Sequence, residues 1–311
     1  MDKNAKIYIA GHTGLTGSAV VRKLLREGYT NLLLRRRGEL NLFDQKAVES
    51  FFRENHPEYV VLCAARVGGI GDNTTHPADF LYENLLIQNN IIWSAHQYSP
   101  KKLIFLGSSC IYPRDAVQPM REDVLLTGKP EPTNEAYAIA KIAGMMLCQK
   151  LVEQYGDNFI SCIPSNLYGP NDHFNDTSGH VIPALIKRIH EAKVNNSSEV
   201  IIWGSGNVKR EFLYIDDFAD AIYWLLSKYA GKEALNIGTG EDITVRDLAH
   251  KIKSIIGYEG ELSFDTSKPD GMPRKLLDIS KANSLGWEYT TRLDKGLQQT
   301  YEWFVLESKK K

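Results

Sequence analysis

The chain has 311 residues, 43% of them hydrophobic, and its 37 basic and 38 acidic side chains leave a formal net charge of −1. This length supports one large domain or two lobes, with a core that needs no disulfide or metal. The near-neutral charge argues against binding to nucleic acid or a membrane surface, and no apolar run reaches the roughly 18 residues of a spanning helix. The four cysteines form no CxxC pair and the charged N-terminus enters a strand at once, so we expect free thiols, no signal peptide and a cytoplasmic protein.

Short apolar segments alternate with segments of helical periodicity through the first half of the chain. Strands are predicted at 6–11, 31–37, 59–65, 102–109 and 158–167. Helices are predicted at about 15–27, 45–54, 78–96 and 135–154. Strands that are apolar throughout and separated by helices are typical of a parallel sheet with both faces covered. The sequence therefore predicts a Rossmann-like α/β fold with a doubly wound parallel sheet.

The pattern changes after residue 170, where polar loops and short strands alternate with helices. We expect residues 1–170 to form a cofactor-binding Rossmann domain. Residues 171–311 are expected to form mainly a smaller substrate-binding lobe, with a return to the first domain from about 210 to 240.

A glycine-rich loop lies between the first predicted strand and the first predicted helix. Its segment GHTGLTG has three glycines at GxxGxxG spacing. Glycine lets a pyrophosphate approach the backbone closely, and the helix N-terminus offers unpaired N–H groups and a partial positive charge. The position after the first strand favours dinucleotide binding over an ordinary turn. The expected contacts are Gly11, Thr13, Gly14, Leu15, Thr16 and Gly17.

Three arginines, Arg35, Arg36 and Arg37, end the second predicted strand. Proteins that bind NAD normally carry an acidic residue there, which would repel a 2′-phosphate, whereas guanidinium groups can bind one bidentately. We therefore expect NADPH as the cofactor rather than NADH. The alternative is a basic edge that is simply solvated.

Tyr137 and Lys141 lie four residues apart in NEAYAIAKIAG, and hence on one face of a helix. A phenol has a pKa of about 10, and a nearby ammonium is expected to bring it closer to the working pH. Ser108 follows the fourth strand, at the edge where open α/β sheets bind ligands. With the glycine loop, this set resembles the short-chain dehydrogenase/reductase superfamily, in its extended branch that modifies sugar nucleotides. The resemblance implies that Tyr137 donates a proton to a ketone, that Lys141 assists it and binds the ribose, and that Ser108 orients the carbonyl.

Longer segments narrow this resemblance. They are IAGHTGLTGS, LCAARVGGI, LGSSCIYP, PTNEAYAIAKIAG, PSNLYGPNDHF, HVIPALIKR, WGSGNVKREFLYIDD and SKPDGMPRKLLD. Together, from about residue 6 to 278, they resemble the GDP-L-fucose synthase family, also called GDP-4-keto-6-deoxy-D-mannose 3,5-epimerase/4-reductases. The resemblance implies an NADPH-dependent enzyme that epimerises and reduces a GDP-sugar in one site. It also implies a homodimer formed through the helices near 78–98 and 135–155.

The family resemblance implies that Cys110 and His180 are the epimerising acid/base pair. Hydrogens at C3 and C5 of the sugar flank the C4 ketone, so removing either one gives an enolate that Ser108 and Tyr137 can stabilise. Inversion then needs a base on one face of the ring and an acid on the other, and thiol and imidazole exchange protons near neutral pH. From its position alone Cys110 would be interpreted as a packed thiol, because free cysteines are usually buried.

The other expected contacts fall into two groups. The resemblance places the nucleotide-sugar on Arg188, Trp203, Arg210 and Asp270, where arginine suits a diphosphate and Trp203 offers a flat surface. Further cofactor contacts are expected at Ala64, Ala65, Leu106, Gly107, Lys141, Pro164, Asn166, Leu167 and His180. Thr13 stands where some family members carry arginine, a contact that the three arginines after the second strand could replace. No metal site is predicted.

Two alternative interpretations are open. A 4-epimerase or 4,6-dehydratase of the same superfamily would keep bound NAD and recycle it. Dehydratases carry an acidic pair after the strand-terminal hydroxyl, where this chain has Ser109 and Cys110 without a carboxylate. A non-catalytic dinucleotide sensor could dispense with Tyr137 and Lys141, so their presence argues against that class.

Overall fold

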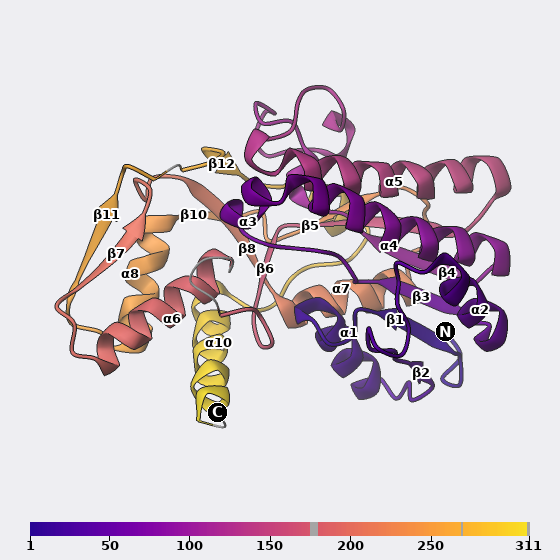
Figure 1. The fold of residues 1–311 in the computed structure, drawn as a ribbon, viewed down its shortest axis with the longest axis horizontal. Helices are drawn as coiled ribbons and strands as arrows, with labels where there is room; N and C mark the ends of the chain where they lie inside the picture. The colour runs from indigo at the N-terminus through magenta and orange to yellow at the C-terminus, as the bar shows by residue number, and fades with distance from the viewer. Residues whose placement is uncertain (175–179, 269, 310–311) are drawn as a thin grey trace.

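The computed structural model describes residues 1–174, 180–268 and 270–309 (Figure 1). Its larger sheet has six parallel strands in the order β2-β1-β3-β4-β5-β9. The strands are β1 (Ile7–Ala10), β2 (Leu32–Leu33), β3 (Tyr59–Leu62), β4 (Lys102–Leu106), β5 (Phe159–Pro164) and β9 (Leu235–Ile237). The predicted doubly wound Rossmann-like fold is confirmed, and β1 lies at the point where the strand order reverses.

Helices cover both faces of this sheet (Figure 1). On one face lie α2 (Gln45–Asn55), α4 (Pro77–Tyr98) and α5 (Glu135–Tyr155), and on the other α1 (Leu15–Arg26) and α7 (Ile215–Ser227). Alternate residues of β1 enter the two cores. Ile7 and Ile9 pack with α1 and α7, whereas Tyr8 and Ala10 pack on the side of α2 and α4. Burial on both faces explains why the strands have apolar sequences without polar alternation.

The second strand is shorter than predicted. Only Leu32 and Leu33 pair with β1, and the chain leaves the sheet before the arginines that were expected to end the strand. The physical reason is that β2 is an edge strand, and a run of guanidinium groups stays near water.

A smaller lobe lies beside the larger sheet and has its own core (Figure 1). Its strands are β6 (Asn166–Tyr168), β7 (Glu199–Trp203), β8 (Lys209–Tyr214), β10 (Asp242–Thr244), β11 (Glu261–Asp265) and β12 (Arg274–Lys275). Its helices are α6 (Val181–Val194), α8 (Val245–Ile256) and α10 (Leu293–Ser308). Ile182 and Ile186 lie one turn apart on α6, and Leu248 and Ile252 lie one turn apart on α8. These two faces pack together in the core of the smaller lobe.

The remaining elements are short and lie outside the sheets and the helices named above. They are α3 (Ile70–Thr75), α9 (Ser280–Ser284) and the 3₁₀ turns η1 (Ser109–Ile111), η2 (Glu122–Val124) and η3 (Pro132–Asn134). Strand β9 and helix α7 belong to the larger sheet and its covering layer although they follow residue 170. We infer that the chain crosses between the lobes more than once, and the division at residue 170 stays a prediction. In the described ranges, no helix combines the length and apolarity needed to span a membrane.

Candidate active site

A cavity of about 1230 Å³ lies where the carboxyl ends of the larger sheet's strands face the smaller lobe. Every catalytic, cofactor-binding and substrate-binding residue predicted from the sequence lines it. The volume exceeds the roughly 300–1,000 Å³ that is typical of a single small-molecule pocket. It therefore suits two ligands bound side by side.

The glycine loop after β1 forms one end of this cavity. Gly11 has a φ of +82°, and a Cβ there would lie 2.8 Å from the Ala64 backbone, while a Cβ on Gly17 would collide with the Gly11 carbonyl. At Gly14 a Cβ would meet only the Gly11 carbonyl, at 3.7 Å. Gly14 also caps α1, whose first turn holds no acidic residue. The exposed helix N-terminus therefore fits the phosphates of a dinucleotide.

The three arginines expected to bind the 2′-phosphate lie beside this loop. The guanidinium of Arg35 is 5.6 Å from the centroid of the Phe51 ring, and that of Arg37 is 5.1 Å from the centroid of Phe43. The Arg36 side chain is exposed, and its backbone N–H donates to Glu39 at 2.7 Å. Stacking on aromatic rings fixes two of the cations at the cavity wall, which suits an anionic group on the cofactor.

Helix α5 presents Tyr137 and Lys141 to the cavity. The Lys141 ammonium donates to the Leu106 carbonyl at 2.9 Å and lies 5.8 Å from the centroid of the Tyr137 ring. Burial lowers the pKa of Lys141 to about 8. Burial also raises the pKa of Tyr137, an effect that Cys110 reinforces and the hydrogen bond with Ser108 opposes.

The expectation that Lys141 brings the Tyr137 phenol close to the working pH is therefore wrong for this structure. Burial dominates, and the ammonium is turned towards a carbonyl. The phenol consequently keeps its proton at neutral pH, which is the state required of a proton donor.

The turn after β4 holds Cys110 among polar groups. The Ser108 hydroxyl accepts a hydrogen bond from the Cys110 backbone N–H at 3.2 Å. At the sulfur, the Asn134 amide donates at 3.2 Å and the Lys275 ammonium at 3.3 Å. Burial raises the pKa of the Cys110 thiol, but Lys275, Ser108 and His180 together outweigh it, and the pKa lies below its ordinary value. These neighbours therefore make the thiolate of Cys110 easier to form than that of an ordinary thiol.

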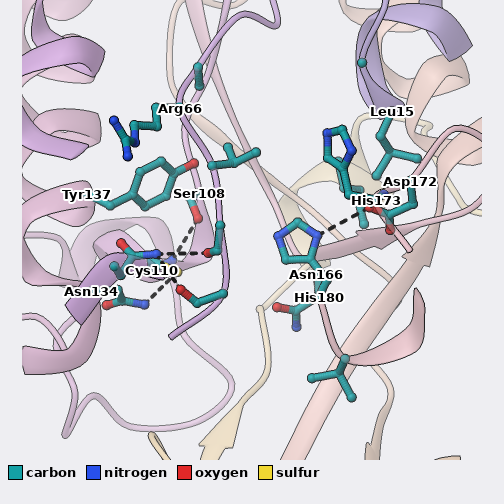
Figure 2. A pocket seen from close by; sticks show the side chains of 18 of the residues that line it. Leu15, Arg66, Ser108, Cys110, Asn134, Tyr137, Asn166, Asp172, His173 and His180 are labelled. Atoms are coloured by element: carbon teal, nitrogen blue, oxygen red, sulfur yellow. Dashed lines mark hydrogen bonds and ion pairs between the residues drawn. The ribbon is translucent and has the colours of Figure 1, made fainter. Parts of the chain in front are cut away.

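His180 precedes α6 and is open to the cavity, whereas its neighbour Asp172 is buried. Its Nδ1 lies 3.6 Å from Oδ1 of Asp172. The neighbouring carboxylate of Asp172 raises the pKa of His180. Figure 2 shows Ser108, Cys110 and Tyr137 on one side of the pocket and His180 with Asp172 on the other. A sugar ring between them would have a thiol on one face and an imidazole on the other.

The residues expected to bind the nucleotide-sugar lie at the far end of the cavity. Trp203 has two cations near its ring centroid, the Arg188 guanidinium at 5.9 Å and the Lys268 ammonium at 5.5 Å. Arg210 donates to the backbone carbonyl of Asp270 at 3.3 Å. The Asp270 carboxylate accepts from the backbone N–H and the hydroxyl of Ser205, both at 2.8 Å. It therefore holds the turn after β7, in addition to any hydroxyl that it binds.

Sequence reasoning missed several polar residues of this site, among them Asn134, Asp172, Lys268 and Lys275. Lys275 is 165 residues away from Cys110 in the chain, so no local spacing could have paired the two. Only the return of β12 beside β8 brings this ammonium to the sulfur.

Lys275→Met is expected to raise the pKa of the Cys110 thiol, because it removes a cation that lies 3.3 Å from the sulfur. Alkylation by iodoacetamide, followed at Cys110 by peptide mass mapping, should then need a higher pH to reach half its maximal rate. Lys251→Met, which breaks a surface ion pair with Asp294, is the matched control. An unchanged alkylation profile in Lys275→Met would show that Lys275 does not act on the thiol.

Comparison with known proteins places this site in a family. The model of the NAD dependent epimerase/dehydratase family matches residues 7–238. The chain is 56% identical to GDP-L-fucose synthase 1 of Arabidopsis thaliana, over 98% of this chain and 94% of that protein. It is 50% identical to GDP-L-fucose synthase of Escherichia coli K12, over 96% of each. A solved GDP-mannoheptose C4 reductase from Campylobacter jejuni with NADP bound is 41% identical, with a TM-score of 0.88, over 98% of this chain and 99% of that one.

The chain therefore belongs to the NAD dependent epimerase/dehydratase family, and within it to the GDP-L-fucose synthases. The resemblance stated from the sequence motifs is confirmed. The protein is an enzyme of the epimerase/reductase type that acts on GDP-sugars.

Proposed function

We propose that this enzyme converts GDP-4-keto-6-deoxy-D-mannose to GDP-L-fucose by epimerisation at C3 and C5 and NADPH-dependent reduction at C4. The observation that carries the proposal is the polar setting of Cys110, with Lys275 and Asn134 at its sulfur. A reductase alone needs Ser108, Tyr137 and Lys141. An activated thiol in the same cavity can in addition remove a proton from carbon, which epimerisation requires.

Epimerisation uses Cys110 and His180 as a base and an acid on opposite faces of the sugar. The pKa of Cys110 is lowered and that of His180 is raised, directions that suit Cys110 as the base and His180 as the acid. The thiolate takes the hydrogen next to the ketone as a proton, and the imidazolium returns a proton to the other face. The side chains of Ser108 and Tyr137 lie next to each other in the pocket (Figure 2), and their hydroxyls would donate to the enolate oxygen that forms between the two steps.

Reduction uses Tyr137 as the acid. The cofactor supplies a hydride when bound, and the glycine loop, Arg35–Arg37 and Lys141 are the residues that would hold it. Tyr137 gives its phenolic proton to the C4 oxygen, so that the ketone gains one hydride and one proton. The positive charge of Lys141 compensates the phenolate that remains until solvent restores the proton.

The direct test is to mix the purified enzyme with GDP-4-keto-6-deoxy-D-mannose and either NADPH or NADH. We expect one NADPH to be oxidised per substrate, with the product inverted at C3 and C5 by NMR. With NADH, kcat/KM should be at least about tenfold lower than with NADPH, because the charge-assisted contacts to the 2′-phosphate are lost. No oxidation of NADPH would contradict the proposal. A product with retained C3 and C5 would show a C4 reductase only, and faster turnover with NADH would overturn the cofactor preference.

We also propose a cytoplasmic homodimer. Tyr82, Trp93 and Ile139 are exposed apolar side chains on α4 and α5, the helices that the family resemblance places at the dimer interface. The cysteines are free thiols, which suits a reducing compartment. Light scattering should give twice the mass of one chain, and a single-chain mass would exclude the dimer.

A further inference from the structure

A buried carboxylate lies beside His180 at the wall of the cavity. Asp172 is 7% exposed, and its Oδ1, which is 3.6 Å from Nδ1 of His180, also accepts from the His173 backbone N–H at 2.8 Å. Its Oδ2 is buried and has no hydrogen-bond partner among the described residues. A buried carboxylate is costly unless a cation or enough donors compensate it. The protonated ring of His180 is such a cation, so this arrangement favours the imidazolium.

The loop that carries Asp172 is tied to the larger lobe. The Asp172 backbone N–H donates to the Gly169 carbonyl at 3.3 Å, which closes a turn. Asn171, in the left-handed region at a φ of 68°, donates from Nδ2 to the Ser18 hydroxyl in α1 at 3.2 Å. Gly169 has a φ of +149°, and a Cβ there would collide with Ile215. Asp172 is therefore presented to His180 from a braced turn.

We propose that Asp172 is a positioning residue that orients the His180 ring and keeps it protonated for its part in epimerisation. The inference rests on the proposed function, in which His180 supplies a proton to the sugar. Because Nδ1 faces Asp172, Nε2 is the nitrogen left for the substrate. The proton passes from Nε2 to carbon, and Nδ1 keeps its hydrogen towards Asp172. Solvent then restores Nε2–H and takes the proton that Cys110 removed from carbon, so no oxidant or reductant is required.

Cys110 and His180 thus each have a partner of opposite charge. Among the described residues, Asp172 and Cys110 are the titratable groups that act on His180, and Lys275, His180 and Arg210 are charged groups that act on Cys110. If the pair had only each other, the proton could pass from imidazolium to thiolate and leave two neutral groups. Asp172 favours the charged form of His180 and Lys275 favours the charged form of Cys110, so both neighbours oppose this transfer.

Asp172→Asn tests this proposal. Asparagine keeps an oxygen for the His173 N–H but carries no charge. Histidine-labelled NMR, with the His180 signal assigned from its absence in His180→Gln, should show the pKa of His180 lower by about one unit or more. At a pH above the His180 pKa of both the unmodified enzyme and the variant, solvent exchange at C3 and C5 should fall about tenfold or more. The reason is that the protonated fraction of His180 falls tenfold for each unit by which its pKa drops. The alkaline limb of the exchange profile should move to lower pH, and Asp172→Glu should recover part of the shift.

The matched control is Asp157→Asn. It removes the carboxylate of another Asp–His pair, in which Asp157 Oδ2 lies 2.7 Å from His96 Nδ1 and neither residue lines the cavity. This variant should leave the exchange profile unchanged. An unaltered His180 pKa in Asp172→Asn would overturn the inference, even if activity fell, because the loss would then be structural. Persistent exchange in His180→Gln would instead overturn the proposed role of His180, so the two failures are distinguishable.

Discussion

Cys110→Ser is expected to reduce solvent-deuterium incorporation at C3 and C5 of the substrate by about 10²–10⁴-fold, the usual contribution of a positioned acid or base. A serine hydroxyl can accept the hydrogen bonds that Asn134 and Lys275 make to the sulfur. It is nevertheless far too weak an acid to be ionised near neutral pH. The measurement is incubation of enzyme and GDP-4-keto-6-deoxy-D-mannose in deuterated water without NADPH, followed by NMR or mass spectrometry of the sugar.

Two comparisons make this result specific to Cys110. Cys148→Ala removes a thiol that is buried in α5, whose pKa burial raises and which does not line the cavity, so exchange should continue at the normal rate. Titration with NADPH should show that Cys110→Ser still binds cofactor, because the glycine loop lies at another part of the cavity. If Cys110→Ala kept full exchange, Cys110 would be a packing residue and the proposed epimerase mechanism would be wrong.

The fold and the position of the cofactor end were predictable because their signals are local. The glycine spacing of GHTGLTG marks a turn between a strand and a helix, and the structure places it between β1 and α1. The apolar strands are buried on both faces as expected. The end of β2 was mispredicted because a sequence window does not show that an edge strand stops where its charged residues begin.

The charge states of the site were not predictable, because they depend on contacts between distant segments. Lys275 reaches Cys110 because β12 pairs with β8. The Asp270 carboxylate accepts a hydrogen bond from the hydroxyl of Ser205, which lies in the turn after β7. The expected effect of Lys141 on Tyr137 failed for a related reason. Spacing places the two on one face of a helix, but burial raises the pKa of the phenol and the ammonium donates to the Leu106 carbonyl instead. Residue type and spacing therefore identify the chemical groups, and packing decides their protonation.

Tyr137→Phe is expected to separate the two half-reactions. NADPH oxidation should fall about 10²–10⁴-fold, because the C4 oxygen loses its proton donor. Exchange at C3 and C5 should fall much less, since Cys110 and His180 remain and the Ser108 hydroxyl can still donate to the enolate oxygen. The two rates are measured on the same substrate, the first from the absorbance of reduced nicotinamide and the second from deuterium incorporation without cofactor.

The control for Tyr137→Phe is Tyr112→Phe. Tyr112 is a buried tyrosine whose hydroxyl donates to Asn236 at 2.6 Å outside the cavity, so its loss should lower the melting temperature without separating the two rates. Equal loss of exchange and reduction in Tyr137→Phe would mean that the phenol stabilises the enolate oxygen in epimerisation as much as it protonates the C4 oxygen in reduction. Undiminished NADPH oxidation would show that Tyr137 is not the proton donor. Ser108 would then be the remaining hydroxyl proposed to protonate the C4 oxygen.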